Sequence, residues 1–129
     1  MPIFKFDPQK SVIFCHAEIA GKGIGLSLKM AVDTGTTYTM IPVEAAVAIG
    51  CNPLQARRKI EITTGSAVEY VPLLRIPKLT AYGIMLKNLE VICHNLPPQS
   101  PIEGLLGLNF LKLAKLKIDF SANHIYTPE

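Results

Sequence analysis

A carboxylate at the end of an apolar strand offers the clearest chemistry in this sequence. The run 26–32 is mostly apolar, reads as a β-strand and ends directly at Asp33. Thr34 brings a hydroxyl that can hydrogen-bond nearby backbone, and Gly35 permits a tight turn with close backbone approach. A carboxylate at the end of a buried strand is costly unless it is paired, hydrogen-bonded or used in chemistry. We therefore expect Asp33 to be a functional acid or base.

The segments that must position Asp33 are predicted to be short strands punctuated by turns, with two short helices. Helices are expected at 43–49, closed by Gly50, and at 108–114. Residues 1–10 are expected to form a loose arm that could add a strand to a partner, and 95–101 a proline-rich loop. The expected strands and extended runs are 11–19, 26–32, 36–42, 59–63, 67–71, 79–86, 89–93, 115–120 and 124–127.

Three sequence elements, in this order and spacing, resemble the retropepsin-like aspartic proteases, the single-domain family that includes the retroviral enzymes. The first is Asp33-Thr34-Gly35 with its trailing Ile41-Pro42. The second is the predicted hairpin centred on Thr64-Gly65-Ser66, and the third is the run Leu105-Leu106-Gly107. The strand expected at 117–120 also fits. The resemblance covers residues 12–126, which is most of the chain.

The resemblance implies an all-β, acid-protease-like single-lobe barrel or sandwich with two short helices, spanning residues 11–127 and forming a homodimer. It implies an aspartic endopeptidase that needs no cofactor and acts on peptide or protein substrates. The 60–70 hairpin would be the flap, a ribbon that closes over the substrate. The residues to which the resemblance gives a role are Asp33, Thr34 and Gly35 in catalysis, Thr36, Ile62, Thr64, Gly65 and Ser66 in substrate binding, and Leu105, Leu106 and Gly107 in support behind the catalytic loop.

Hydrolysis by carboxylates requires two of them, one acting as general base toward a water and the other, protonated, polarising the scissile carbonyl. The chain has a single Asp-Thr-Gly, because neither Asp7 nor Asp119 is followed by Thr-Gly or Ser-Gly. The pair must therefore come from two copies of the chain, related by a twofold axis that passes between the two Asp33 side chains. Resemblance to the family adds that Thr34 would hydrogen-bond across this axis, and that the Gly35 carbonyl would bind the substrate backbone.

Thr36 departs from the alanine or serine that is usual in the family at this position. A hydroxyl at this position can donate to the carboxylate and favour its charged form. We therefore expect a lower pKa for the carboxylate pair and a more acidic optimum than an alanine would give.

Composition narrows the remaining possibilities. With 129 residues, 49% hydrophobic and 18% charged, the chain fits one folded domain with apolar surface left to cover, as in a dimer interface. The net charge of +3 and a basic cluster without interleaved aromatics argue against nucleic-acid binding. No apolar run is long enough to span a bilayer. Three cysteines without a signal-peptide pattern favour reduced thiols and a cytoplasmic location.

Other classes of function have weaker support. Two Cys-His dipeptides, at 15–16 and 93–94, could suggest zinc, but adjacent residues on a strand point to opposite faces. The main rival to the protease is a catalytically inactive module of the same fold that dimerises or binds peptides. A dimeric domain for a non-peptide ligand is a third possibility, disfavoured because the sequence carries no metal, phosphate or cofactor signature.

Overall fold

Ten strands, two short α-helices and one 3₁₀ turn form within residues 2–128, the part of the chain that this computed structural model describes. The helices are α1 (Val43–Ala48) and α2 (Leu108–Leu113), and the 3₁₀ turn is η1 (Pro53–Gln55). None of the helices in this part of the chain is long and apolar enough to cross a membrane. The strands are β1 (Ile3–Lys5), β2 (Ile13–Gly21), β3 (Ile24–Val32), β4 (Thr39–Ile41), β5 (Arg58–Thr63), β6 (Val68–Ala81), β7 (Ile84–Cys93), β8 (Gly104–Leu106), β9 (Lys117–Asp119) and β10 (His124–Tyr126).

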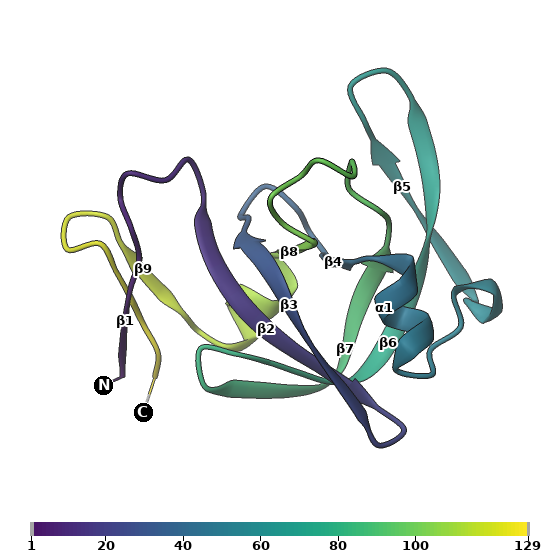
Figure 1. The fold of residues 1–129 in the computed structure, drawn as a ribbon, viewed down its shortest axis with the longest axis horizontal. Coiled ribbons are helices and arrows are strands. Elements are labelled where there is room, and N and C mark those ends of the chain that lie inside the picture. The colour runs from purple at the N-terminus through teal and green to yellow at the C-terminus, as the bar shows by residue number, and fades with distance from the viewer. Residues whose placement is uncertain (1, 129) are drawn as a thin grey trace.

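Six of the strands close into a barrel. The order is β2-β3-β8-β4-β7-β6, and β2 also pairs with β6, which completes the ring. Closure satisfies the strand edges that an open sheet would expose. β5 pairs with β6 alone, so the β5–β6 hairpin extends beyond the barrel wall and stands away from it (Figure 1). The fold is therefore the all-β barrel with two short helices that the sequence predicts.

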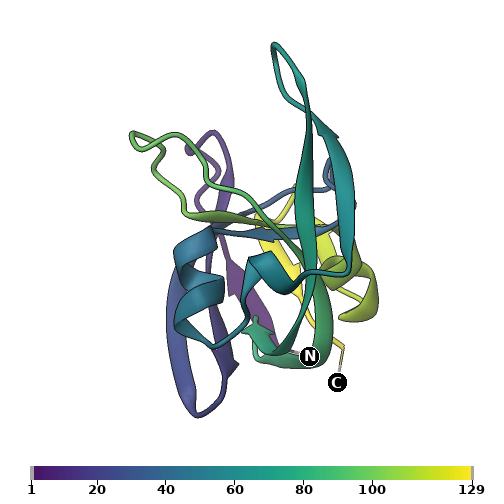
Figure 2. The same cartoon turned by 90° about the vertical axis from the view of Figure 1, so that its right-hand side faces the viewer.

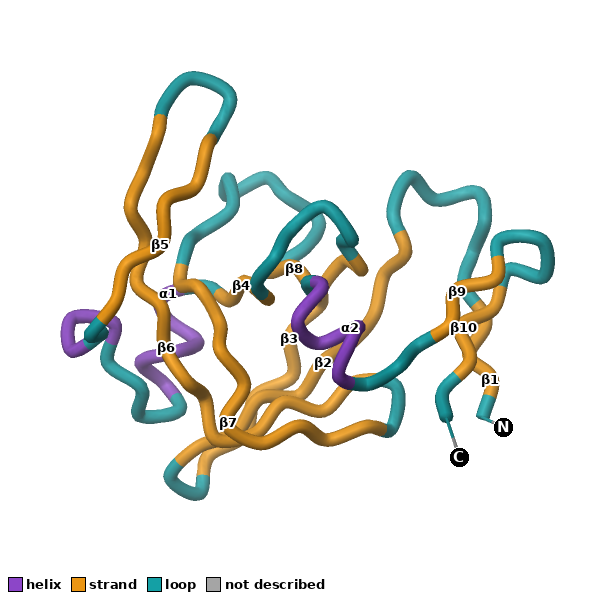
Figure 3. Tube along the Cα trace, turned by 180° about the vertical axis from the view of Figure 1, so that it is seen from behind, coloured by secondary structure: helices purple, strands orange, loops and turns teal. Residues whose placement is uncertain are grey.

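The chain ends meet in a second, three-stranded sheet, ordered β1-β10-β9. The register pairs Phe4 with Ile125 and Ile125 with Ile118. Both termini lie together at this sheet, on the opposite side of the barrel from the β5–β6 hairpin (Figure 1). In the view from behind, α2 runs into the loop that leads to β9 (Figure 3). The expectation of a loose N-terminal arm was wrong, because β1 is paired within its own chain.

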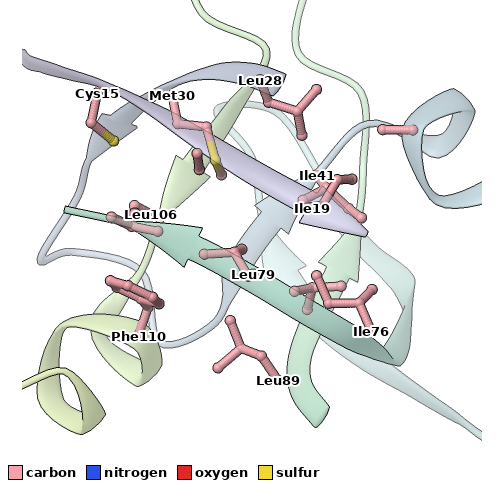
Figure 4. Packing of buried hydrophobic residues seen from close by; sticks show 14 of the residues in the cluster. Cys15, Ile19, Leu28, Met30, Ile41, Ile76, Leu79, Leu89, Leu106 and Phe110 are labelled. Atoms are coloured by element: carbon pink, nitrogen blue, oxygen red, sulfur yellow. The ribbon is translucent and has the colours of Figure 1, made fainter. Parts of the chain in front are cut away.

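The barrel is filled by apolar side chains that alternate along the strands. Along β2, Cys15, Ala17 and Ile19 point inward while the residues between them are more exposed. They meet Met30 from β3 and Phe110 from α2 in one cluster (Figure 4). This period-two pattern is that of a strand with one buried face. The core therefore anchors β3 and α2, the two elements that flank the candidate site.

The predicted strands between the hairpin and residue 93 also differ from those of the structure. We expected Pro72 and Pro77 to interrupt the chain, with two strands joined near 87–88. Instead, β6 continues through both prolines, and its turn to β7 is at Tyr82-Gly83, with φ of 53° and 75°. These positive φ values are those of a tight type I′ hairpin turn. Asn88, opposite Pro77, has a φ of 54° but lies within β7, so the local irregularity is not a turn.

Candidate active site

Asp33 lies directly after β3, where the strand leaves the barrel. Val32 pairs with Leu106 in the parallel β3–β8 ladder, and the backbone N–H of Asp33 donates to the Leu106 carbonyl at 3.0 Å. The residue is half-buried, whereas Thr34 and Gly35 after it are exposed. The barrel therefore fixes the backbone of Asp33 while the loop carries its carboxylate to the surface.

The carboxylate is held by its own loop. Asp33 Oδ1 accepts a hydrogen bond from the Gly35 backbone N–H at 2.8 Å, which closes a turn of the Asx type. A Cβ at position 35 would lie 3.1 Å from that same oxygen, so a larger residue would crowd the carboxylate. Gly35 therefore lets the turn close without a side chain that would crowd the Asp33 carboxylate.

Thr36 does not have the role that we expected for its hydroxyl. Its Oγ1 donates to the carbonyl of Tyr38 at 3.0 Å, and its own carbonyl accepts from the Leu108 N–H at 2.9 Å. The predicted hydrogen bond to the Asp33 carboxylate is therefore wrong, because the hydroxyl is engaged on the other side of the loop. The argument for a more acidic optimum fails with it, and Thr36 instead ties the Asp33 loop to the start of α2.

Gly107 brings two loops into backbone contact behind Asp33. A Cβ at this position would lie 2.6 Å from the carbonyl carbon and oxygen of Tyr38 and 2.8 Å from the Thr39 nitrogen. Only glycine fits such an approach without a shift of the backbone. Of its neighbours, Leu106 is fully buried and Leu105 is half-buried at the edge of the smaller apolar cluster.

A polar network that the sequence analysis missed links the same two loops. Asn109 Oδ1 accepts hydrogen bonds from Thr39 N, Thr39 Oγ1 and Phe110 N, each at 2.9 Å, and Asn109 Nδ2 donates to the Glu90 carbonyl. The Thr39 hydroxyl also accepts from Gly107 N at 3.1 Å. Thr39 is fully buried, so these bonds satisfy groups that water cannot reach. Two features of the sequence could have indicated this network: the amide residue Asn109 in a mostly apolar helix, and the hydroxyl residue Thr39 beside the apolar Met40 and Ile41.

The β5–β6 hairpin presents Ile62 to the barrel and its tip to solvent. Ile62 is half-buried against the smaller apolar cluster, which contains Met40, Val71, Leu73 and Ile92. At the tip, Thr64 donates to the Ala67 carbonyl through its backbone N–H at 2.8 Å and its hydroxyl at 3.1 Å.

The other two tip residues predicted to bind substrate, Gly65 and Ser66, are exposed. A Cβ at position 65 would meet nothing within 4 Å, so glycine is not required there by packing. The structure therefore gathers Asp33, Thr36, Leu106 and Gly107 in one place and leaves the hairpin tip standing apart.

Solved structures with this architecture are retropepsin-like aspartic proteases. A retropepsin-like aspartic protease from Rickettsia conorii superimposes with a TM-score of 0.71 at 17% identity, covering 97% of this chain and 87% of that one. The retroviral protease-like domain of Ddi1 from Leishmania major gives 0.62 at 16% identity, covering 94% of this chain and 91% of that one. The Simian Foamy Virus (mac) protease superimposes with a TM-score of 0.53 at 19% identity, covering 81% of this chain and 97% of that one. The chain thus has the retropepsin-like fold.

A family model narrows the assignment. Residues 17–113, which include every element of the site described above, match the model of the gag-polyprotein putative aspartyl protease family. The chain belongs to this family, as the resemblance seen in the sequence implied. Among curated proteins, none matches the sequence significantly.

Proposed function

We propose that this chain is an aspartic endopeptidase whose active site forms between two copies of the chain. The observation that carries the proposal is the Asp33 loop: a half-exposed carboxylate whose turn is closed by Gly35 and whose backbone is bonded to Leu106. Such a loop holds the acid in a fixed orientation before any substrate arrives, which is what acid–base catalysis requires. Membership of the protease family supports the same conclusion.

The requirement for a second chain rests on the other two aspartates, both of which cap turns. Asp119 Oδ1 accepts bonds from the N–H of Ser121, the hydroxyl of Ser121 and the N–H of Ala122. Asp7 Oδ1 accepts from the Gln9 N–H at 2.9 Å. Asp119 ends β9 and Asp7 follows β1, so both belong to the terminal sheet rather than to the barrel strands β3 and β8 that hold Asp33, and neither is followed by Thr-Gly or Ser-Gly. A homodimer supplies the missing acid from the same position of the second copy.

In this dimer the two Asp33 carboxylates share one proton, because two like charges in contact cannot both ionise, as in aspartic proteases generally. The ionised carboxylate takes a proton from a bound water, which attacks the scissile carbonyl. The protonated carboxylate donates toward the carbonyl oxygen. Thr34 links the two loops across the axis and Gly35 binds the substrate backbone through its carbonyl. The β5–β6 hairpin closes over the extended peptide as a flap and excludes water.

Peptide cleavage tests this proposal. Purified protein is incubated with a peptide library from pH 3 to 8, beside Asp33→Asn and the matched control Asp119→Asn. We expect cleavage by the wild type and by Asp119→Asn, and none by Asp33→Asn with its fold unchanged by circular dichroism. Cleavage that survives in Asp33→Asn would refute the proposal. No cleavage by the wild type at any pH would favour the inactive peptide-binding or dimerisation module instead.

A further inference from the structure

The β5–β6 hairpin has two faces, and the strand register assigns its side chains to them. Ile60 pairs with Val71, and Ile62 pairs with Glu69 two residues nearer the tip. Directly paired residues in an antiparallel ladder point to the same face. Because Ile60, Ile62 and Val71 pack on the apolar cluster of the barrel, Glu69 lies on this same inward face. A carboxylate on the inner side of the hairpin, beside Ile62 and Val71, requires an explanation.

A contact across the site confirms the direction of Glu69. Its Oε2 lies 4.0 Å from Nε2 of His94, which follows β7 and whose backbone N–H donates to the Ile41 carbonyl at 3.1 Å. The loop that His94 begins rises on the same side of the barrel as the hairpin (Figure 1 and Figure 2). The Glu69 side chain retains 48% exposure, so it is not consumed by this contact.

The hairpin has one other charged residue on its inward face, and it lies at the base. Arg58 pairs with Leu73 in the register and has its guanidinium 4.0 Å from the Glu90 carboxylate. Its charge is therefore partnered and remote from the tip. Within the described chain, the inward face of the hairpin near its tip thus carries one formal charge, the negative charge of Glu69.

We propose that Glu69 is a specificity residue that selects a lysine or arginine side chain in the peptide substrate. The inference rests on the proposed function, in which an extended peptide lies beneath this hairpin. Side chains of an extended peptide alternate in direction, so one of them points toward the hairpin beside Ile62 and Glu69. An aliphatic stem would pack on Ile62 while its cationic end meets the carboxylate. An acidic side chain there would meet a like charge.

His94 sets the strength of this preference. Its imidazole lies 4.0 Å from the Glu69 carboxylate and therefore competes with the basic side chain of the peptide for it. Removing the imidazole therefore frees the carboxylate for the substrate. We expect His94→Gln to raise the preference for a basic side chain, the opposite of the effect of Glu69→Gln. A purely structural role for Glu69 would not produce opposite shifts from the two partners.

Profiling the cleavage of peptides tests the inference. Sets of peptides that differ at one position, as Lys, norleucine or Glu, are cleaved by the wild type, Glu69→Gln, His94→Gln and the control Glu61→Gln. Glu61 is on the same hairpin but pairs with Tyr70 on the outer face, where its carboxylate accepts from the Tyr70 hydroxyl at 3.4 Å. We expect kcat/KM for Lys over norleucine to fall at least about fivefold in Glu69→Gln, which corresponds to about 1 kcal/mol. It should stay unchanged in Glu61→Gln.

Failure of this inference is distinct from failure of the proposed function. Cleavage by the wild type without a basic preference, or with a preference that Glu69→Gln leaves intact, would overturn the role of Glu69 and leave the protease proposal standing. If the wild type cleaves nothing, the same peptides are titrated against Asp33→Asn by fluorescence anisotropy. Weaker binding of the Lys peptide by the double variant Asp33→Asn/Glu69→Gln than by Asp33→Asn would support the recognition of basic side chains. Equal binding by the two proteins would overturn it.

Discussion

Replacing Thr39 by valine should destabilise the chain by about 2 kcal/mol, because it removes a hydroxyl that both loops of the site use. Thr39 is fully buried, and valine keeps the shape of the side chain. Asn109 Oδ1 still accepts hydrogen bonds from two other donors, Thr39 N and Phe110 N, so losing the Thr39 hydroxyl costs this oxygen little. The N–H of Gly107 loses its acceptor in a buried position, which costs about 1–3 kcal/mol.

The measurement is urea unfolding at a fixed protein concentration, since association would otherwise shift the midpoint. In thermal unfolding of a domain of this size, the same loss of stability should lower Tm by about 6–10 °C. Thr39→Ser is the matched control, because it keeps the hydroxyl and removes one methyl group, at about 1 kcal/mol. Amide hydrogen exchange at Gly107 should accelerate in Thr39→Val more than in Thr39→Ser. A Thr39→Val protein as stable as the wild type, or more stable than Thr39→Ser, would refute the reasoning.

Three further outcomes follow from other parts of the structure. Gly107→Ala should cost about 2 kcal/mol or more, since its methyl would lie 2.6 Å from the opposing loop backbone; an unchanged urea midpoint would contradict this close approach. Burial raises the pKa of Cys15 to about 11 and of Cys93 to about 12, so both thiols stay protonated at pH 8, and iodoacetamide should modify the more exposed Cys51 first in peptide mass spectra. Equal rates for the three thiols would exclude this order. Within the described residues the buried Tyr82 hydroxyl makes no hydrogen bond of good geometry, and its polar neighbour is the weakly bonding Cys15 thiol. Tyr82→Phe should therefore leave stability unchanged or raise it by up to about 1 kcal/mol; clear destabilisation in thermal melts would show that the thiol is a true partner.

Most of the fold could be predicted from local patterns. The alternation in 11–19 and the mostly apolar run 26–32 gave β2 and β3 to within about two residues, a margin usual for element ends. Gly50, with a φ of 84°, closes the first helix as its position suggested. The path of β6 could not be predicted this way, because Pro72 and Pro77 are tolerated only at particular positions of the ladder, and those positions depend on the partner strands.

The site was less predictable, because its side chains take partners from distant segments. Asp33 and its turn are local, and the motif identifies them. The Thr39–Asn109 hydrogen bonds join residues 70 positions apart, so neither residue alone carries a signal. From the sequence, the Thr36 hydroxyl could donate either to the Asp33 carboxylate or to a backbone carbonyl. Only the folded loop shows that it donates to the Tyr38 carbonyl. The inward direction of Glu69 likewise depends on the register of the hairpin.

Mixing subunits tests most directly whether two Asp33 carboxylates form one active site. Wild-type chain is incubated with Asp33→Asn chain until the subunits exchange, and peptide cleavage is measured at constant wild-type concentration. A site shared by two chains predicts that an equal amount of the variant leaves about half of the activity, and a threefold excess about a quarter, because mixed dimers hold one aspartate. Activity that stays constant at every ratio, with exchange verified by native mass spectrometry, would contradict the shared site.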